Sequence, residues 1–84
     1  GYEYNYKNGI LHGTYRNWYK NKNLMYDHNY HNGSFYGLCQ AWWESGNPRD
    51  EYNYNNGGKY GFCRSWNKNG NVRYEKNYID EELQ

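Results

Sequence analysis

A period of 24 residues runs through most of this chain and constrains its fold more than any other feature of the sequence. The recurring columns are Tyr6/Tyr30/Tyr54/Tyr78, Gly9/Gly33/Gly57, Gly13/Gly37/Gly61, Trp18/Trp42/Trp66 and Asn29/Asn53/Asn77. A repeat of this length is one supersecondary unit that buries its surface against neighbouring units. We therefore expect one repeat array over residues 1–78, with a half unit at 1–5 and units at about 6–29, 30–53 and 54–77. The remaining residues, 79–84, are expected to form an acidic C-terminal cap or tail.

Each unit contains two turn signals, separated by strand-forming sequence. The first signal is an Asn-Gly pair, which favours a two-residue type I′ hairpin because both turn residues must adopt positive φ. It occurs at Asn8-Gly9, Asn32-Gly33 and Asn56-Gly57, and a second signal of similar chemistry occurs at Lys22-Asn23, Gly46-Asn47 and Gly70-Asn71. The segments between turns are rich in Tyr and Trp, which prefer strands. The sequence predicts an all-β fold: an elongated antiparallel meander of stacked β-hairpin repeats with about seven strands.

Two-residue loops at both turns would also fix which residues face each other across the sheet. They place a ring or imidazole opposite each strand glycine: Tyr4 opposite Gly13, His28 opposite Gly37 and Tyr52 opposite Gly61. They place Tyr26 opposite Cys39 and Trp43 opposite Asp50 on the same face. On the other face, Trp18, Trp42 and Trp66 are expected opposite Asp27, Glu51 and Glu75. Because both faces then carry aromatic rings, we expect a twisted ribbon in which side chains stack between units.

Residues 6–21, YKNGILHGTYRNWYKN, closely resemble the MORN-variant repeat, whose unit reads approximately Y-x-N-G-x-x-x-G-x-W-x-x-Y-Y-x-N-G. The pattern recurs in all three units, although Lys22 stands where the second turn usually has Gly, and the His-Gly pair occurs only at His12-Gly13. The resemblance implies stacked β-hairpins and a role in protein association. Members of this family occur in bacterial toxin–antitoxin-type loci, in protist scaffolds and in large DNA viruses.

The composition gives no sign of a partner chosen by bulk charge. The formal net charge is +1, with both signs interspersed, so no basic patch predicts binding to nucleic acid or to an anionic membrane. No apolar run approaches the roughly 20 residues needed to span a bilayer. The chain begins at Gly1 without an initiator Met and opens on a half unit, so we expect either a fragment of a longer protein or an end that another subunit covers.

Residue types that could support chemistry are expected to be structural. Cys39 and Cys63 occupy one repeat column, two strand spacings or roughly 9.5 Å apart, which is too far for a disulfide. We expect small buried side chains there, and neither zinc nor any other metal or cofactor. His28 is expected to pack and His12 and His31 to lie near turns. The repeated acids are expected to accept hydrogen bonds from indole N–H groups or from Arg64 and Arg73.

These observations favour a non-catalytic structural or protein-interaction module, such as a component of a scaffold or virion, located inside a cell or a viral particle. The tyrosine and glycine columns would form its spine. Exposed Trp and Tyr are favoured interface anchors, so Trp18, Trp42, Trp66 and the unit-specific Trp43 are the candidate partner surface. Two alternatives remain: an antitoxin-like inhibitor of one cognate protein, and an aromatic module that binds carbohydrate or choline by cation–π contact.

Overall fold

The chain folds as an antiparallel meander of β-hairpins, as the turn signals predict. The computed structural model describes residues 2–3 and 5–79, so Tyr4 and most of the expected acidic cap lie outside the described residues. The strands are β1 (Tyr2–Glu3), β2 (Tyr6–Lys7), β3 (Ile10–Leu11), β4 (Gly13–Trp18), β5 (Leu24–His31), β6 (Ser34–Phe35), β7 (Gly37–Trp42), β8 (Pro48–Asn55), β9 (Gly58–Lys59), β10 (Gly61–Trp66) and β11 (Val72–Tyr78). None of the described residues is helical.

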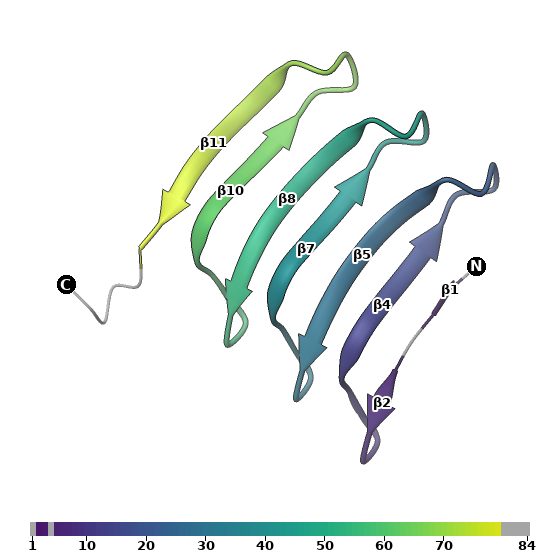
Figure 1. Ribbon diagram of the computed structural model, residues 1–84, viewed down its shortest axis with the longest axis vertical. Coiled ribbons are helices and arrows are strands. Elements are labelled where there is room, and N and C mark those ends of the chain that lie inside the picture. Colours follow the sequence, from purple (N-terminus) through teal and green to yellow (C-terminus); the bar gives the residue numbers. More distant parts are fainter. Residues whose placement is uncertain (1, 4, 80–84) are drawn as a thin grey trace.

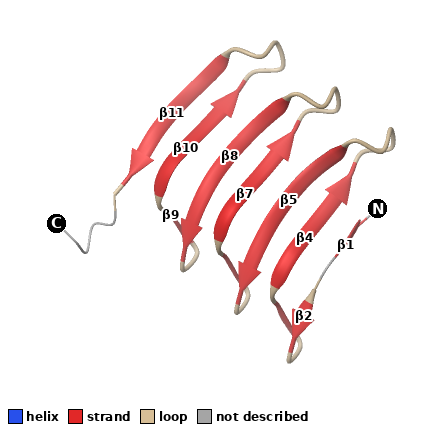
Figure 2. Ribbon diagram, viewed as in Figure 1, coloured by secondary structure: helices blue, strands red, loops and turns tan. Residues whose placement is uncertain are grey.

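The sheet is a single layer. Its main path runs in the order β1-β4-β5-β7-β8-β10-β11, with β6 and β9 extending hairpins of β5 and β8, and with β2 paired to β3. The strands lie side by side and bend in the same sense along their length, with the Asn-Gly turns at one end and the longer turns at the other (Figures 1 and 2). The Cα atoms extend over 39 × 34 × 9 Å, so the molecule is a thin plate, about as wide as it is long.

The Asn-Gly turns have the predicted geometry. Asn32 and Gly33 adopt φ values of 51° and 85°, and the flanking residues His31 and Ser34 pair directly. The turns of successive units also touch, because the Gly33 N–H donates to the Leu11 carbonyl at 2.9 Å. These Asn-Gly turns therefore close two-residue type I′ loops and link one unit to the next.

The second turn differs from the prediction. Only one residue of each loop has positive φ, at Lys22, Gly46 and Gly70. The Gly46 N–H donates to the Trp43 carbonyl at 2.9 Å, and the Trp43 N–H donates to the Asn47 carbonyl at 2.8 Å. This is the three-residue loop in which a type I turn is followed by a left-handed residue. The predicted two-residue loop is wrong because Asn47 does not take the second left-handed position.

Beyond the Asn-Gly turns the predicted register is wrong, because each hairpin contains a bulge at the glycine column. After Tyr30 pairs with Phe35, the next described pair of β5 is Asp27 with Gln40, so two residues on β5 face four on the other strand. Gly37 lies in this bulge with a φ of 69°. The predicted ring opposite the glycine is present but comes from the following strand, since Gly13, Gly37 and Gly61 pair with Tyr30, Tyr54 and Tyr78. His28 and Tyr52 are therefore not the glycine partners.

The tryptophan and acid pairing is also wrong in detail. Trp18, Trp42 and Trp66 pair with Leu24, Pro48 and Val72, where the register shifts again. The acids instead face Arg16, Gln40 and Arg64. The contacts are an Arg16–Asp27 ion pair at 3.7 Å and an Arg64–Glu75 ion pair at 3.4 Å. The predicted Arg64 partner is thus present, but in the described part of the chain these acids accept from no indole N–H.

The asparagine column bridges the bulge. The Asn53 carbonyl accepts from the Tyr60 N–H at 2.8 Å, and the Asn53 side-chain Nδ2 donates to the Phe62 carbonyl at 2.8 Å. Asn29 makes the same pair of bonds with Tyr36 and Leu38. The amide thus supplies a donor to a carbonyl that the bulge removes from the regular ladder. This explains why Asn recurs at this position.

Replacing Asn53 with Asp is expected to lower the free energy of unfolding by about 1 kcal/mol, because an acceptor then faces the Phe62 carbonyl. Urea denaturation would measure the change. Asn77→Asp is the matched control, since no described residue accepts from the side-chain amide of Asn77. Equal losses in the two variants would contradict the bridging role.

Candidate functional site

The two faces of the sheet carry different side chains. We call one the tyrosine face, defined by Tyr26, Tyr52, Tyr54, Tyr74 and Tyr78 together with Cys39, Ala41, Cys63 and Ser65. The other is the tryptophan face, defined by Trp18, Trp42, Trp66, Leu38 and Phe62 together with the ion pairs. These are the predicted faces, because a net register error of two residues leaves the paired side chains on their predicted side.

The tyrosine face buries its small residues although no second layer covers it among the described residues. Cys63, Ser65, Cys39 and Ala41 are between 0% and 4% exposed. The Tyr52 and Tyr74 hydroxyls, from β8 and β11, hydrogen bond to each other across β10, which carries Cys63 and Ser65. Large rings on alternate strands thus cover small residues on the strands between them. Cys39 and Cys63 are the small buried side chains that the sequence predicted.

The tyrosine column does not stack directly from unit to unit. Phe35 lies between two of its members, with ring centroids 5.0 Å from both Tyr30 and Tyr54. In the next unit the equivalent residue is Lys59, whose Nζ lies 4.6 Å from the Tyr52 ring and 5.4 Å from the Tyr78 ring. The predicted spine is therefore continuous only with these interleaved side chains. Tyr6, at the start of the column, is 63% exposed.

Burial on this face shifts several pKa values. Desolvation raises the pKa of the Tyr52 hydroxyl, and its hydrogen bond with Tyr74 raises it further. Desolvation also raises the pKa of Cys39 and of Tyr54, so these side chains are neutral at physiological pH. The same desolvation lowers the pKa of His28, against a smaller raising effect of Asp27.

We expect the lowered pKa of His28 to make stability depend on pH. The unfolded state takes up a proton near its ordinary value of 6.5, whereas the folded state resists it. The free energy of unfolding should therefore fall as the pH drops from about 7.5 to about 5. Urea denaturation at several pH values would show this decrease. The variant His28→Tyr introduces the residue found at the equivalent position of the next unit, Tyr52, and should make the free energy of unfolding less dependent on pH. An unchanged pH dependence would contradict the assignment to His28.

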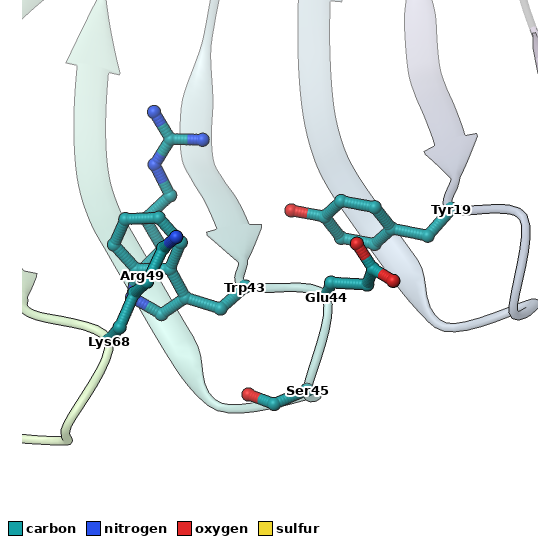
Figure 3. Close-up of a pocket in the computed structure, with 6 residues that line it drawn as sticks. All are labelled: Tyr19, Trp43, Glu44, Ser45, Arg49 and Lys68. Carbon is teal, nitrogen blue, oxygen red and sulfur yellow. The ribbon is translucent and has the colours of Figure 1, made fainter.

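A cleft lies at the long-turn end of the molecule, around the unit-specific Trp43. Its volume is about 400 Å³, and it is lined by Tyr19, Trp43, Glu44, Ser45, Arg49 and Lys68. Figure 3 shows the Arg49 and Lys68 side chains gathered at the indole, with the ring of Tyr19 across from it. The Arg49 Cζ is 4.9 Å and the Lys68 Nζ is 5.4 Å from the centroid of a Trp43 ring.

The turn that carries the cleft is held by the neighbouring unit. Asn21 and Asn23 donate from their side chains to the Glu44 carbonyl, each at 2.9 Å. The Tyr19 hydroxyl donates to the Trp42 carbonyl at 2.7 Å. Side-chain hydrogen bonds from the preceding unit thus fix the wall of the cleft before any ligand binds.

A second depression, of about 240 Å³, lies on the tyrosine face and shares one residue with the first. It is lined by Tyr26, His28, Phe35, Cys39, Gln40, Ala41, Arg49, Asp50, Tyr52 and Tyr54. Arg49 lines both spaces. The bulge beside Trp42 turns its side chain to the same face as that of Asp50, and its Nε lies 3.4 Å from an Asp50 carboxylate oxygen. The two depressions therefore adjoin along the middle unit.

The remaining predicted candidates are dispersed. Trp18, Trp42 and Trp66 are half-buried on the tryptophan face, and the Arg64 guanidinium lies 5.7 Å from the Trp66 ring. Trp43 is on the opposite face, so the four candidates do not form one surface. The His12 and His31 rings lie 5.1 Å apart at the Asn-Gly end. Within residues 2–3 and 5–79, no three His, Cys, Asp or Glu side chains are grouped to hold a metal.

Sequence reasoning identified Trp43 but not its cationic neighbours. Arg49 stands in a column with Met25 and Arg73, and Lys68 in one with Lys20 and Glu44. The usable signal was that the residues at positions 43, 44 and 49 differ from those of the preceding unit. The bulge that turns Arg49 toward the cleft carries no comparable signal.

No family model matches this chain, and no curated protein or solved structure is significantly similar to it. The described residues contain no helix long and apolar enough to cross a membrane.

Proposed function

We propose that this chain is a non-catalytic protein-interaction module that acts within a larger protein assembly and is covered on its tyrosine face by a partner. The observation that carries the proposal is the single 9 Å layer of Cα atoms, whose aromatic side chains have only each other as cover among the described residues. Folded domains ordinarily bury a sheet face against a second layer. Tyr, Trp and Arg on a rigid, contoured surface are the residues that anchor protein interfaces.

The non-catalytic part of the proposal rests on what the ionisable side chains already do. Asp27 and Glu75 pair with arginines, and Asp50 accepts from the Ser65 hydroxyl at 2.8 Å. His28 packs against the Tyr26 and Phe35 rings, both at 5.1 Å. These groups are engaged in structure, and they leave no nucleophile beside a free base among the described residues.

An antitoxin-like inhibitor of one cognate protein is the second candidate. The Trp43 cleft favours it, because its residues differ from unit to unit, whereas a lattice contact would use repeated surfaces. The choline-binding alternative is disfavoured at this cleft, since Arg49 and Lys68 already lie against the Trp43 ring and would repel a quaternary amine. The MORN-variant resemblance supports protein association in either case.

The test uses the full chain as bait in a lysate of the organism that encodes it. Phe35→Lys removes the central apolar ring of the tyrosine face. Lysine already occupies the equivalent position of the next unit, Lys59, so the fold should tolerate the substitution. Leu38→Thr is the matched control on the tryptophan face, where Thr14 is the equivalent residue. Native mass spectrometry gives the identity and stoichiometry of what stays bound.

We expect a stoichiometric partner that Phe35→Lys loses and Leu38→Thr retains. Many copies in one particle would support the assembly component, and a one-to-one complex would support the inhibitor. Loss in Leu38→Thr alone would move the contact to the tryptophan face. A chain that binds no protein would overturn the proposal.

A further inference from the structure

The Trp43 cleft contains hydrogen-bond donors that the described part of the chain leaves unused. The Trp43 Nε1–H is buried and has no acceptor among the described residues. Arg49 directs only its Nε toward Asp50, and no described residue accepts from its two Nη groups. The Lys68 Nζ likewise has no carboxylate partner among the described residues, and its only described contact is the Trp43 ring.

Leaving these donors together has an energetic cost. A buried indole N–H without a partner loses its hydration without gaining a bond. Two cations beside the same ring repel each other; Asp50 offsets the charge of Arg49 from outside the cleft, and Glu44 is the carboxylate side chain that lines the cleft with them. An incoming oxyanion would supply the missing acceptor and would reduce the repulsion between the cations.

The shape and lining of the cleft select among anions. Its volume of about 400 Å³ lies at the small end of ligand sites, so it accommodates one or two side chains. The rings of Trp43 and Tyr19 offer apolar surface beside the donors, which suits a ligand with a carbon skeleton. Glu44 penalises a doubly charged group such as phosphate more than a single carboxylate.

We propose that this cleft binds a carboxylate side chain of an acidic segment of a protein partner, with a neighbouring apolar side chain packed between Trp43 and Tyr19. The proposal rests on the proposed function, because it names the chemistry of the partner at one end of the tyrosine face. The carboxylate accepts from Lys68 Nζ, from the free Nη groups of Arg49 and from Trp43 Nε1. The cleft lies next to the second depression through Arg49, so the same segment can continue along the middle unit.

The test measures binding of a fluorescein-labelled peptide of alternating Glu and Leu to the full chain by fluorescence anisotropy. The peptide with Gln in place of Glu is the uncharged control. We expect the Glu peptide to bind at least about tenfold more tightly than the Gln peptide. Lys68→Gln should weaken binding of the Glu peptide by about tenfold.

Two variants separate recognition from bulk charge and from folding. Lys20→Gln removes the same charge at the equivalent position of the first unit, outside the cleft, and should leave binding unchanged. Trp43→Phe keeps a ring but removes the unpaired N–H, so it should weaken peptide binding without lowering the melting temperature. A merely structural indole would show the opposite pattern.

Several outcomes would overturn the inference: equal binding of the Gln peptide, equal effects of Lys20→Gln and Lys68→Gln, no binding, or displacement of the peptide by an equal concentration of inorganic phosphate. The last result would assign a small-anion site. Failure here is distinguishable from failure of the proposed function. If the bait captures a partner that Phe35→Lys loses while the peptide does not bind, only the inference is wrong.

Discussion

Replacing Gly37 with valine is expected to lower the free energy of unfolding by about 2 to 3 kcal/mol. The cause is the backbone, because Gly37 has a φ of 69° and a Cβ built there meets no atom within 4 Å. A crowding mechanism, in which the added side chain meets the ring opposite, is therefore not supported. A branched residue is the least able to adopt this conformation. Urea denaturation of the full chain would measure the loss.

A series at the same position separates strain from crowding. Asn tolerates positive φ better than Ala although it is larger, so the expected order of stability is the native Gly37, then Gly37→Asn, Gly37→Ala and Gly37→Val. Gly58→Ala is the matched control, since the φ of Gly58 is not positive and its Cβ would have ordinary contact distances. That variant should be neutral or slightly stabilising. If Gly37→Asn were less stable than Gly37→Ala, crowding would be the cause after all.

The predicted faces survived an incorrect register for a physical reason. The Asn-Gly turns fixed the hairpins correctly, as His31 pairs with Ser34. The glycine bulge then displaced the pairing by two residues, and the three-residue turn together with the bulge beside Trp42 displaced it by two residues again, which keeps the paired side chains on their predicted faces. Position-specific pairs such as tryptophan with acid were lost, because they depend on the exact count. The local pattern therefore predicted the face of the sheet on which a paired residue lies, but not the residue opposite it on the next strand.

The bulge was not predicted because a glycine in a strand has two structural interpretations. Sequence reasoning took Gly13, Gly37 and Gly61 as positions covered by a ring; each does pair with a tyrosine, but a Cβ built at Gly37 or Gly61 meets no ring atom within 4 Å. It did not use the second interpretation, in which glycine supplies a positive φ. The asparagine column was the available clue, since an amide that recurs just before each Asn-Gly loop needs a backbone partner of its own.

The candidate site was predicted only as one residue. Trp43 was singled out because its column also contains Tyr19 and Asn67. The chemistry of the cleft also depends on Arg49. Its guanidinium reaches the Trp43 indole only because the bulge beside Trp42 places Arg49 with Asp50 on the tyrosine face. Lys68 arrives from the following unit. Contacts that join three units require the register, and the register was the part that the sequence did not determine.

A sheet one layer thick must obtain its core from its own side chains. On the tyrosine face this is done by rings that lean over small residues, and Cys63 at 0% and Ser65 at 1% exposure are the most completely covered of the described residues. The cover over them comes from Tyr52 and Tyr74, joined by their hydroxyl groups. Stability is therefore concentrated in a few half-exposed rings, which are also the surface that we propose for the partner.

Replacing Tyr52 with alanine is consequently expected to lower the free energy of unfolding by about 2 to 4 kcal/mol. The variant loses the hydroxyl contact with Tyr74, the edge-on contact with Tyr54 at 6.3 Å and the cation–π contact with Lys59 at 4.6 Å. It also uncovers the small residues of β10. The midpoint and slope of a urea transition would measure the change.

Two further variants decide whether the ring or the hydroxyl matters. Tyr52→Phe removes only the hydroxyl and should cost about 1 kcal/mol, and adding Tyr74→Phe should cost little more, because the two hydroxyls share one bond. Tyr36→Ala is the control for loss of a ring, since Tyr36 is 51% exposed. Its effect should stay below about 1 kcal/mol. Equal losses in Tyr36→Ala and Tyr52→Ala would mean that the covering rings are not the core of this sheet, and that its stability comes from the hydrogen-bonded ladder alone.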